Sequence, residues 1–319
     1  HRTIHFLLID LLIRQGKTEE ALTEIEEACV VFGVTEGMLA AGLELRRTIG
    51  PMAIPDEKQA TGASVSLCMI MKNEQDNLPR CLKSLKPVVD EIIITDTGST
   101  DSSRQIAELF GARLFEFPWN GDFSAARNVS LEHASGKWIL VMDADEVLSE
   151  LDYRRFRDLV EAAPPAGAAY DIVTRNYMFT INLEKWRPND GRYPNDEAGA
   201  GWTPSNKVRL FPNLTGIRFE NPVHEMVDLS IASRKIPILH TDIPVHHYGH
   251  LDKERQKRKG EEYYLLGKKK LEQSGGNDFR ALCELAVQAG GIGRYQEAVE
   301  LWERVLAINP SYPDRKSVV

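Results

Sequence analysis

Two carboxylates stand close together after a strongly apolar segment of the chain. Asp143-Ala144-Asp145 follows Trp138-Ile139-Leu140-Val141-Met142, which has the length and composition of a buried strand. Acidic side chains at one strand end repel each other unless a cation or a hydrogen-bond donor compensates them. A divalent cation with oxygen ligands would do so, and a nucleotide diphosphate could complete its ligand shell. The alternative is a pair of ordinary capping and surface acids.

A second polar string, Asp96-Thr97-Gly98-Ser99, follows the apolar segment 91–95. Its glycine permits a tight turn from a strand into a helix, and Ser99, Thr100 or Asp101 can cap that helix. We expect turn and capping roles for Thr100 and Asp101. Asp96 stands at the strand end, where its carboxylate can accept the ring N–H of a uracil, so we expect base recognition there.

The segments that carry these residues alternate between strand and helix patterns. The predicted strands are 65–71, 91–95, 112–117 and 138–142, and the predicted helices are 77–86, 102–110 and 123–133. This order predicts an α/β domain with a mainly parallel sheet and helices on both faces. Ligands of such sheets bind beyond the carboxyl ends of the strands, which is where the polar strings fall.

The composition divides the chain into four parts. We expect a helical repeat-like hairpin over 1–49, a linker over 50–63, the α/β domain over 64–250 and a helical extension over 251–319. The linker mixes proline, glycine and charged residues. In the extension, residues fall at the offsets of a tetratricopeptide repeat. These are Gly293, Tyr295, Ala298 and Pro310.

The N-terminal helices show the same spacing more weakly, since Gly16 and Ala21 match Gly293 and Ala298. Plain helical hairpins are the alternative for both regions. Each region holds about one repeat, which cannot stack into a solenoid alone. We therefore expect these helices to pack on the α/β domain or to continue in further repeats.

The bulk composition is that of a globular protein, with 319 residues, 42% of them hydrophobic, and a formal charge of −8. A mildly acidic chain without a dense basic stretch argues against nucleic acid as the main partner. No stretch is long and apolar enough for a transmembrane helix, and none resembles a signal peptide. The four cysteines lack metal-site spacing and predict buried free thiols, so we expect a cytoplasmic protein.

Four motifs in fixed order and spacing now point to a family. Lys72-Asn73-Glu74, Asp96 to Asp101, Ala126-Arg127-Asn128 and Asp143-Ala144-Asp145-Glu146 together resemble the family 2 glycosyltransferases of GT-A fold, over about residues 64–250. The motif Asp96-Thr97-Gly98 resembles the corresponding motif of the subgroup that contains sublancin-type S-glycosyltransferases and tetratricopeptide-linked relatives. Thr97 replaces a second carboxylate found in many relatives, so Asp96 would carry the base contact alone.

The resemblance implies roles for the residues that would bind a nucleotide sugar. Lys72 and Glu74 would border the nucleoside, and Asp96 would hold the base. Arg127 would face the nucleotide, since a guanidinium suits bidentate contact with a base edge or a phosphate. The alternative for Arg127 is an ion pair on its own helix, with Asp122 or Glu132.

The same resemblance divides the acidic pair. Asp143 would reach the ribose, and Asp145 would bind a divalent cation, Mn²⁺ or Mg²⁺. Related proteins often use a late histidine as a further metal ligand, and the segment His246-His247-Tyr248-Gly249-His250 offers three. His247 is the first choice by position. The alternative is histidine packing against Tyr248 at a strand end.

The acceptor side is expected in the second half of the domain. Inverting transfer needs a carboxylate that takes the proton of the attacking acceptor. Glu225, next to His224, is the candidate base, and Glu146 is a competitor. A structural His-Glu pair is the alternative. Arg209 lies on the strand before this loop, where it would touch the diphosphate, Glu225 or a structural partner.

The segment 186–202 is rich in Pro, Gly, Asn and Asp and predicts a mobile lid or an acceptor loop. Trp186 and Trp202 could stack on a sugar or peptide, and packing within the protein is the alternative.

Together these features predict an inverting, metal-dependent glycosyltransferase that uses a nucleotide sugar, with a UDP-sugar as first choice. The repeat-like helices favour a protein or peptide as the acceptor, and they could also mediate homo-oligomerisation. A degenerate transferase domain that serves as a protein-binding scaffold is the alternative from another class. A nucleotidylyltransferase is a third, although a glycine-rich phosphate loop is not evident.

Overall fold

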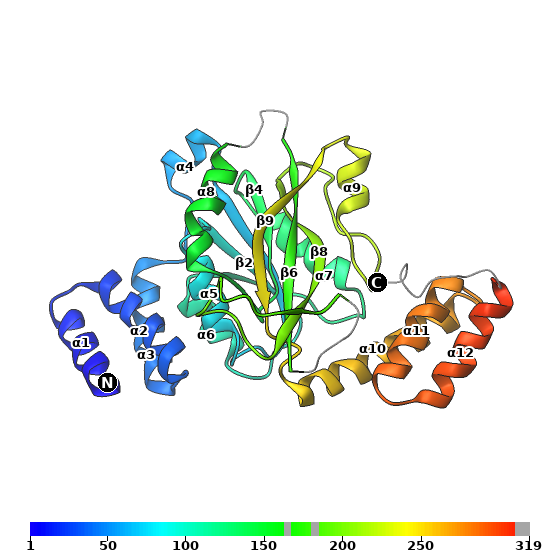
Figure 1. The fold of residues 1–319 in the computed structure, drawn as a ribbon. Coiled ribbons are helices and arrows are strands. Elements are labelled where there is room, and N and C mark those ends of the chain that lie inside the picture. Colours follow the sequence, from blue (N-terminus) through cyan, green and yellow to red (C-terminus); the bar gives the residue numbers. More distant parts are fainter. Residues whose placement is uncertain (163–166, 180–184, 310–319) are drawn as a thin grey trace. The chain divides into compact units, whose positions relative to one another are not determined.

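The computed structural model describes residues 1–162, 167–179 and 185–309, and Pro310 therefore lies outside the described residues. Two compact units are present, His1–Tyr248 and Gly249–Val319. Figure 1 shows the first unit as a twisted sheet with helices on both sides, and the second unit as a set of helices.

The predicted alternation of strands and helices is found in the first half of the larger unit. Its strands are β1 (Val65–Met71), β2 (Glu91–Asp96), β3 (Arg113–Glu116) and β4 (Trp138–Val141). Its helices are α5 (Leu78–Leu85), α6 (Ser103–Leu109) and α7 (Phe123–His133). All three helices connect parallel strands, because β3, β2, β1 and β4 lie in this order and pair in parallel.

The second half extends the same sheet with mixed pairing. The further strands are β5 (Glu146–Leu148), β6 (Ala169–Met178), β7 (Arg187–Pro188), β8 (Gly201–Pro212) and β9 (Ile238–His247). The full order is β3-β2-β1-β4-β8-β6-β9-β5, with β7 beside β8. β8 joins β4 in an antiparallel pair, and β9 runs parallel to β6 and antiparallel to β5. The predicted α/β class is confirmed, and the antiparallel pairs are confined to the part after β4.

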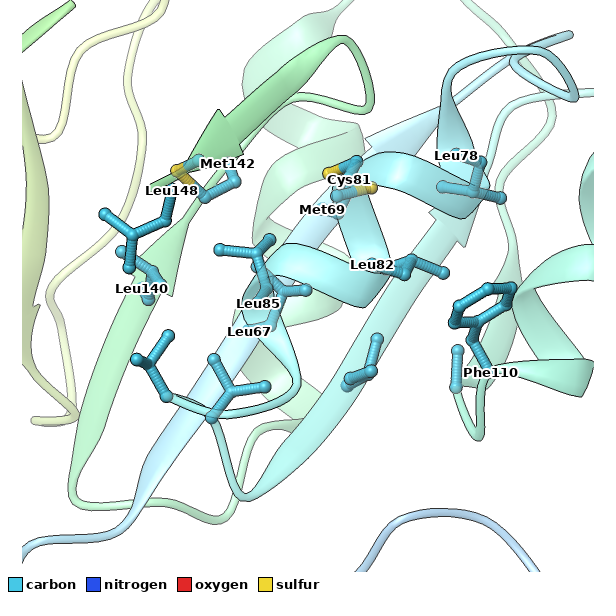
Figure 2. Packing of buried hydrophobic residues seen from close by; sticks show 14 of the residues in the cluster. Leu67, Met69, Leu78, Cys81, Leu82, Leu85, Phe110, Leu140, Met142 and Leu148 are labelled. Carbon is cyan, nitrogen blue, oxygen red and sulfur yellow. The ribbon is translucent and has the colours of Figure 1, made fainter. Parts of the chain in front are cut away.

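Side chains alternate between the two faces of the central strands. Leu67 and Met69 of β1 belong to one apolar cluster, whereas Cys68 belongs to the other. Figure 2 shows Leu78, Cys81, Leu82 and Leu85 of α5 over the first of these faces. Burial on both faces explains the continuous apolar run of β1, since a strand covered on one side would alternate with polar residues. The parallel strands are therefore held rigidly from both sides.

Three N-terminal helices share the core of the sheet. They are α1 (Arg2–Arg14), α2 (Thr18–Phe32) and α3 (Glu36–Ile49), and their buried Leu22, Ile25 and Met38 belong to the same cluster as β1. A Cβ at Gly42 of α3 would lie 2.1 Å from Leu109 of α6, so the two helices approach closely at this glycine. These helices pack on the sheet domain, which was one of the two arrangements expected from the sequence.

A buried ion-pair cluster reinforces this packing. Glu26 of α2, whose side chain is 2% exposed, accepts from Lys86 Nζ at 2.6 Å and from Arg46 Nη2 at 3.1 Å. Arg46 also donates to the carbonyl of Leu109 at 3.0 Å. Helices α2 and α3 are thereby tied to Lys86, which follows α5, and to the C-terminal end of α6.

The stretch predicted as a linker is partly helical and partly bound to the sheet domain. It contains α4 (Asp56–Thr61), and the amide of Met52 donates to the carbonyl of Gly111 at 2.9 Å. It remains the connection between α3 and β1. The remaining helices of this unit are α8 (Tyr153–Glu161) and α9 (Asp228–Ser233).

The smaller unit contains α10 (Lys253–Gln273), α11 (Phe279–Gly291) and α12 (Tyr295–Ile308). Leu285 and Ala286 of α11 and Ala298 of α12 are buried in one cluster. Gly293 in the intervening turn has φ of 82°, a conformation that glycine adopts without strain. This hairpin agrees with the expected repeat positions that fall within the described residues.

All four cysteines are free and buried, as predicted. Among the helices of the described residues, none combines the length and the apolar character needed to cross a membrane.

The Glu26 cluster gives a stability prediction. Glu26→Ala leaves two cations without their buried partner, so we expect the free energy of unfolding to fall by about 3 kcal/mol. Glu27→Ala is the matched control, because Glu27 is 43% exposed and pairs with Lys83 at 3.2 Å. Urea denaturation of the two variants measures the difference. Equal effects would show that the buried cluster does not hold the N-terminal helices on the sheet domain.

Candidate functional site

The ends of β1 and β2 are joined by hydrogen bonds between side chains and backbone. Asp96, which is 2% exposed, accepts from the amide of Ser99 at 3.1 Å and from its hydroxyl at 2.5 Å. Asn73 in turn accepts from the amide of Thr100 at 2.8 Å. Asp101 accepts from the amide of Ser103, the first residue of α6, at 2.9 Å, whereas the N-cap residue Ser102 makes no capping bond through its side chain. Asp96 thus shapes the turn, and its predicted base contact stays a prediction.

Thr97 connects the two strands in a way that a carboxylate could not. Its hydroxyl donates to the carbonyl of Met71 at 3.1 Å, and its amide donates to the same oxygen at 3.0 Å. An ionised aspartate has no proton to donate, so threonine suits this position. Glu74 nearby is 8% exposed and accepts from Asn77, whereas Lys72 at the end of β1 is exposed.

Arg127 of α7 joins two acidic residues that are far apart in the sequence. Its Nη2 donates to Asp143 Oδ1 and its Nε donates to Glu225 Oε1, both at 2.8 Å. The guanidinium also lies over the ring of Phe219, with 5.5 Å between Cζ and the ring centroid. The alternative was an ion pair with Asp122 or Glu132, and the ion pairs of Arg127 that the structure describes are instead with Asp143 and Glu225.

One nitrogen of Arg127 remains available. Nη1 is buried and has no hydrogen-bond partner among the residues that the structure describes. A buried donor without a partner costs free energy, so such a group is suited to contact with a ligand.

The turn after β4 carries Asp143 and is closed from within. The amide of Asp143 donates to Glu146 Oε2 at 2.8 Å, and the amide of Glu146 donates to the carbonyl of Asp143 at 3.1 Å. Burial alone would raise the pKa of Asp143, but Arg127, Lys207 and Arg209 outweigh it and hold the pKa well below its usual range. Asp143 is therefore a carboxylate at neutral pH.

Glu146 is bound on both oxygens by Arg209 of β8. The distances are 2.7 Å to Oε2 and 2.5 Å to Oε1, and both side chains are 2% exposed. Arg209 also donates to Thr174 Oγ1 at 2.9 Å and to the carbonyl of Val141 at 3.3 Å. These contacts match the structural-partner alternative for Arg209, and they leave Glu146 poorly placed to act as a base.

Asp145 and His247 come together through the pairing of β5 with β9. Glu146 lies opposite His247 in this register, and the amide of Tyr248 donates to the carbonyl of Asp145 at 3.2 Å. As a result, His247 Nε2 lies 3.5 Å from Asp145 Oδ2. Two cis ligands of a cation with bonds of about 2.1 Å lie about 3 Å apart, so this pair is close to the spacing required.

The donor set at Asp145 and His247 is incomplete for a metal held by protein alone. Among the described residues, no group of three or more His, Cys, Asp or Glu side chains is placed to hold a metal ion. One carboxylate and one imidazole fit a cation that takes its other ligands from a diphosphate and water. The two residues therefore suit a cation that is shared with a bound diphosphate, and they do not form a metal site that protein ligands complete alone.

The neighbouring His246 belongs to the interior. It is 0% exposed, its Nδ1 is 2.8 Å from the hydroxyl of Tyr177, and its ring packs against Tyr193. Burial, followed by the charges of Arg175 and Arg80, lowers the pKa of His246 to about 3. Its ring is therefore neutral and embedded among aromatic side chains, although these are Tyr177 and Tyr193 rather than the expected Tyr248.

The loop that carries Glu225 is fixed to the start of α7. Asn128 donates to the carbonyl of Phe219 at 3.0 Å and accepts from its amide at 2.8 Å. Glu220 and Met226 form an antiparallel bridge across the loop. His224 is exposed and has φ of 56°, a left-handed conformation that is uncommon for a residue with a side chain. The side chain of Glu225 is 18% exposed.

The segment 186–202 is anchored within the protein at a few of its residues, while most of the others are exposed. Tyr193 and Trp202 are buried, and the guanidinium of Arg175 lies over both rings, at 4.8 and 4.5 Å. Tyr248 donates through its hydroxyl to the carbonyl of Asp196 at 2.7 Å. Packing within the protein therefore accounts for Trp202, the alternative that was left open for it.

The structure thus brings Arg127, Asp143 and Glu225 into direct contact, and Asp145 beside His247. Three contributors were not singled out from the sequence. Asn176 on β6 contacts His247, Asn128 holds the Glu225 loop, and Lys207 Nζ lies 3.7 Å from Asp143 Oδ2. Asn128 stands inside a recognised motif and Lys207 lies two residues before Arg209, so the sequence offered a signal for both. The sequence offered no such signal for Asn176.

Comparison with known proteins finds a match to one family model. Residues 66–221 match the family model described as Glycosyl transferase family 2. A TPR repeat-containing protein of Synechococcus elongatus is 39% identical over 175 residues, which cover 54% of this chain and 38% of that protein. Glycosyltransferase SunS of Bacillus phage SPbeta is 32% identical over 121 residues, which cover 34% of this chain and 27% of that protein.

Among solved structures, mannosyltransferase PcManGT of Pyrobaculum calidifontis, in complex with GDP-Man and Mn²⁺, is similar over 95% of this chain and 94% of that chain, with 14% identity and a TM-score of 0.42. The matched part covers between 27% and 53% of the length of the curated relatives.

The anchoring of the Glu225 loop gives a prediction. Asn128→Ala removes both side-chain bonds to the backbone of Phe219, so we expect a loss of about 1 to 3 kcal/mol in stability. Hydrogen exchange at the amide of Phe219 should accelerate at least about tenfold. Asn120→Ala is the control, because Asn120 is exposed and accepts a single bond from Asp122. Unchanged exchange at Phe219 would contradict the anchoring role.

Proposed function

We propose that this chain transfers a sugar from a nucleotide diphosphate donor to an acceptor hydroxyl or thiol, with inversion at the anomeric carbon. The match of residues 66–221 to the model of Glycosyl transferase family 2 supports this proposal. A UDP-sugar is the first-choice donor. Two contacts carry the proposal. Arg127 binds both Asp143 and Glu225, and Asp145 in the same turn as Asp143 lies beside His247.

The donor nucleotide is proposed to lie over the ends of β1, β2 and β4. Asp96 is the base contact, with Lys72 and Glu74 bordering the nucleoside. Asp143 is an ionised acceptor for the ribose hydroxyls, and the available Nη1 of Arg127 adds a donor beside it. Arg209 acts on the donor indirectly, because it fixes Glu146 and through it the turn that carries Asp143.

The diphosphate is proposed to be held with a divalent cation, Mn²⁺ or Mg²⁺, at Asp145 and His247. Such a cation would neutralise the charge that develops on the leaving diphosphate. Lys207 is placed to assist, because its ammonium lies 3.7 Å from Asp143 and its side chain is 55% exposed. The chain therefore offers positive charge on the solvent side of the acidic turn.

The acceptor proton is proposed to pass to Glu225. The bond from Arg127 occupies Oε1, so Oε2 can take the proton as the acceptor oxygen or sulfur attacks the sugar. The same bond sets the direction of the carboxylate. The adjacent His224 is exposed, and we assign it to contact with the acceptor rather than to the proton transfer itself.

A protein or peptide is the proposed acceptor class. Helical hairpins with repeat-like spacing flank the family 2 domain in sequence, and one relative of this chain is described as a TPR repeat-containing protein. Stacked hairpins of this kind present extended surfaces for peptides. Association of the chain with itself through these helices is a further proposal, which light scattering would test.

The cation at Asp145 gives the first functional prediction. Asp145→Ala should abolish Mn²⁺-dependent binding of UDP in calorimetry, and with it the turnover of UDP-sugars, because half of the protein's donor set is lost. Glu150→Ala serves as the control, because Glu150 is an exposed acid five residues further along. Turnover that survives in Asp145→Ala would remove the assignment. A wild-type chain that shows no Mn²⁺-dependent heat with UDP would favour the scaffold alternative.

The proposed base Glu225 gives the second functional prediction. Glu225→Gln keeps an oxygen for Arg127 but cannot take a proton, so kcat should fall by about a hundredfold or more while UDP binding is unchanged. The assay uses an acceptor found by screening serine- and cysteine-containing peptides with several UDP-sugars. Glu220→Gln, in the same loop and 3.8 Å from Arg218, is the control. Retention of anomeric configuration in the NMR spectrum of the product would contradict the inverting mechanism.

A further inference from the structure

Asn176 lies at the point where three strands meet beside the proposed cation. In the sheet register, Asn176 of β6 is opposite His247 of β9 on one side and Thr203 of β8 on the other. Its side-chain oxygen is 2.8 Å from His247 Nδ1. Asn176 therefore contacts His247, one of the two proposed metal ligands, but is not itself a proposed ligand.

The orientation of the Asn176 amide is fixed by its neighbours. The nitrogen end lies 3.0 Å from the carbonyl of Thr203, 2.9 Å from Ser205 Oγ and 3.4 Å from the carbonyl of Thr174. Carbonyl oxygens only accept hydrogen bonds, so this end of the side chain must be the NH₂ group. The oxygen end must then face His247, and the assignment follows from chemistry rather than from the placement of two similar atoms.

The fixed amide determines which ring nitrogen of His247 carries the proton. An amide oxygen is an acceptor, so His247 Nδ1 must donate to it. In the neutral ring, Nε2 then presents its lone pair toward Asp145 Oδ2, at 3.5 Å. Two acceptors that face each other at this distance repel unless a proton or a metal ion lies between them, and the second case is the arrangement of a metal ligand pair.

We propose that Asn176 is a positioning residue that makes His247 a metal ligand, by holding its ring in the Nδ1–H form with Nε2 directed at the cation beside Asp145. This inference rests on the proposed function, since it concerns the same cation. An oxygen and an imidazole nitrogen together favour a first-row transition metal over Mg²⁺, which prefers oxygen ligands. The site thereby selects Mn²⁺ over Mg²⁺.

The first measurement is Mn²⁺ affinity of the full chain with UDP present, followed through the electron paramagnetic resonance signal of free Mn²⁺. Asn176→Ala should weaken Mn²⁺ binding by about 10- to 100-fold, the usual effect of losing the partner that orients a ligand. Mg²⁺ binding should change less, so the preference for Mn²⁺ should narrow. Asn206→Ala is the matched control, because exposed Asn206 likewise bonds across β8 and β6, to Asp171 Oδ2 at 2.7 Å.

Asn176→Asp separates positioning from a structural role. The carboxylate still accepts from His247 Nδ1 but loses the bond to the Thr203 carbonyl and places a negative charge beside that oxygen, so it should damage stability at least as much as alanine does. If Asn176 acts by orienting His247, Asn176→Asp should nevertheless keep Mn²⁺ affinity within a few-fold of wild type. Mn²⁺ affinity that follows stability in both variants would overturn the proposal.

The tautomer is measured directly by the ¹⁵N shifts of the His247 ring in the metal-free protein. The wild type should show the Nδ1–H form, and Asn176→Ala should lose it. An Nε2–H form in the wild type would overturn the proposal even if the alanine variant did not fold. Wild-type protein that binds UDP but no Mn²⁺ would overturn both this inference and the assigned cation. Normal Mn²⁺ binding in both wild type and Asn176→Ala would overturn this inference alone.

Discussion

The buried ion pair between Glu146 and Arg209 is the interaction on which the site depends. It joins the turn after β4 to β8, the strand with which the parallel half of the sheet passes into the mixed half. A buried ion pair gains little net stability, because desolvation of both groups offsets their attraction. The contribution of this ion pair is to fix the geometry of the site. Glu146 also accepts from the amide of Asp143, so the pair fixes the turn that presents Asp143 and Asp145.

A second arginine links the two sides of the proposed reaction. Arg127 holds Asp143, assigned to the donor, and Glu225, assigned to the acceptor, with bonds of equal length. A shift of the guanidinium toward either carboxylate weakens its hold on the other. The proposed donor binding at Asp143 would therefore be coupled to the direction of the Glu225 carboxylate through one side chain, which no separate pairing of these acids would achieve.

Much of the parallel half could be predicted from the sequence because its signals are local. Apolar runs such as 65–71, and the polar residues at their ends, follow from strand and helix periodicity alone, and strand ends share one edge in a parallel sheet. The mixed half could not be predicted, because its contacts depend on register between distant strands. Asn176, His247 and Asp145 meet only through the pairing of β6, β9 and β5. A change of one residue in that register would turn each side chain to the other face.

The balance of charge around the turn supports the proposal of a cation there. Glu146 and Arg209 neutralise each other, whereas Asp143 and Glu225 share the single charge of Arg127. Lys207 opposes the remaining charge from 3.7 Å, but its side chain is 55% exposed and water screens it. Asp145 adds a further carboxylate, only 6% exposed, beside His247. A diphosphate could not approach these acids unaided, because like charges in a partly buried site repel strongly. The proposed divalent cation at Asp145 and His247 would remove that repulsion and would make the acidic turn complementary to the anionic donor.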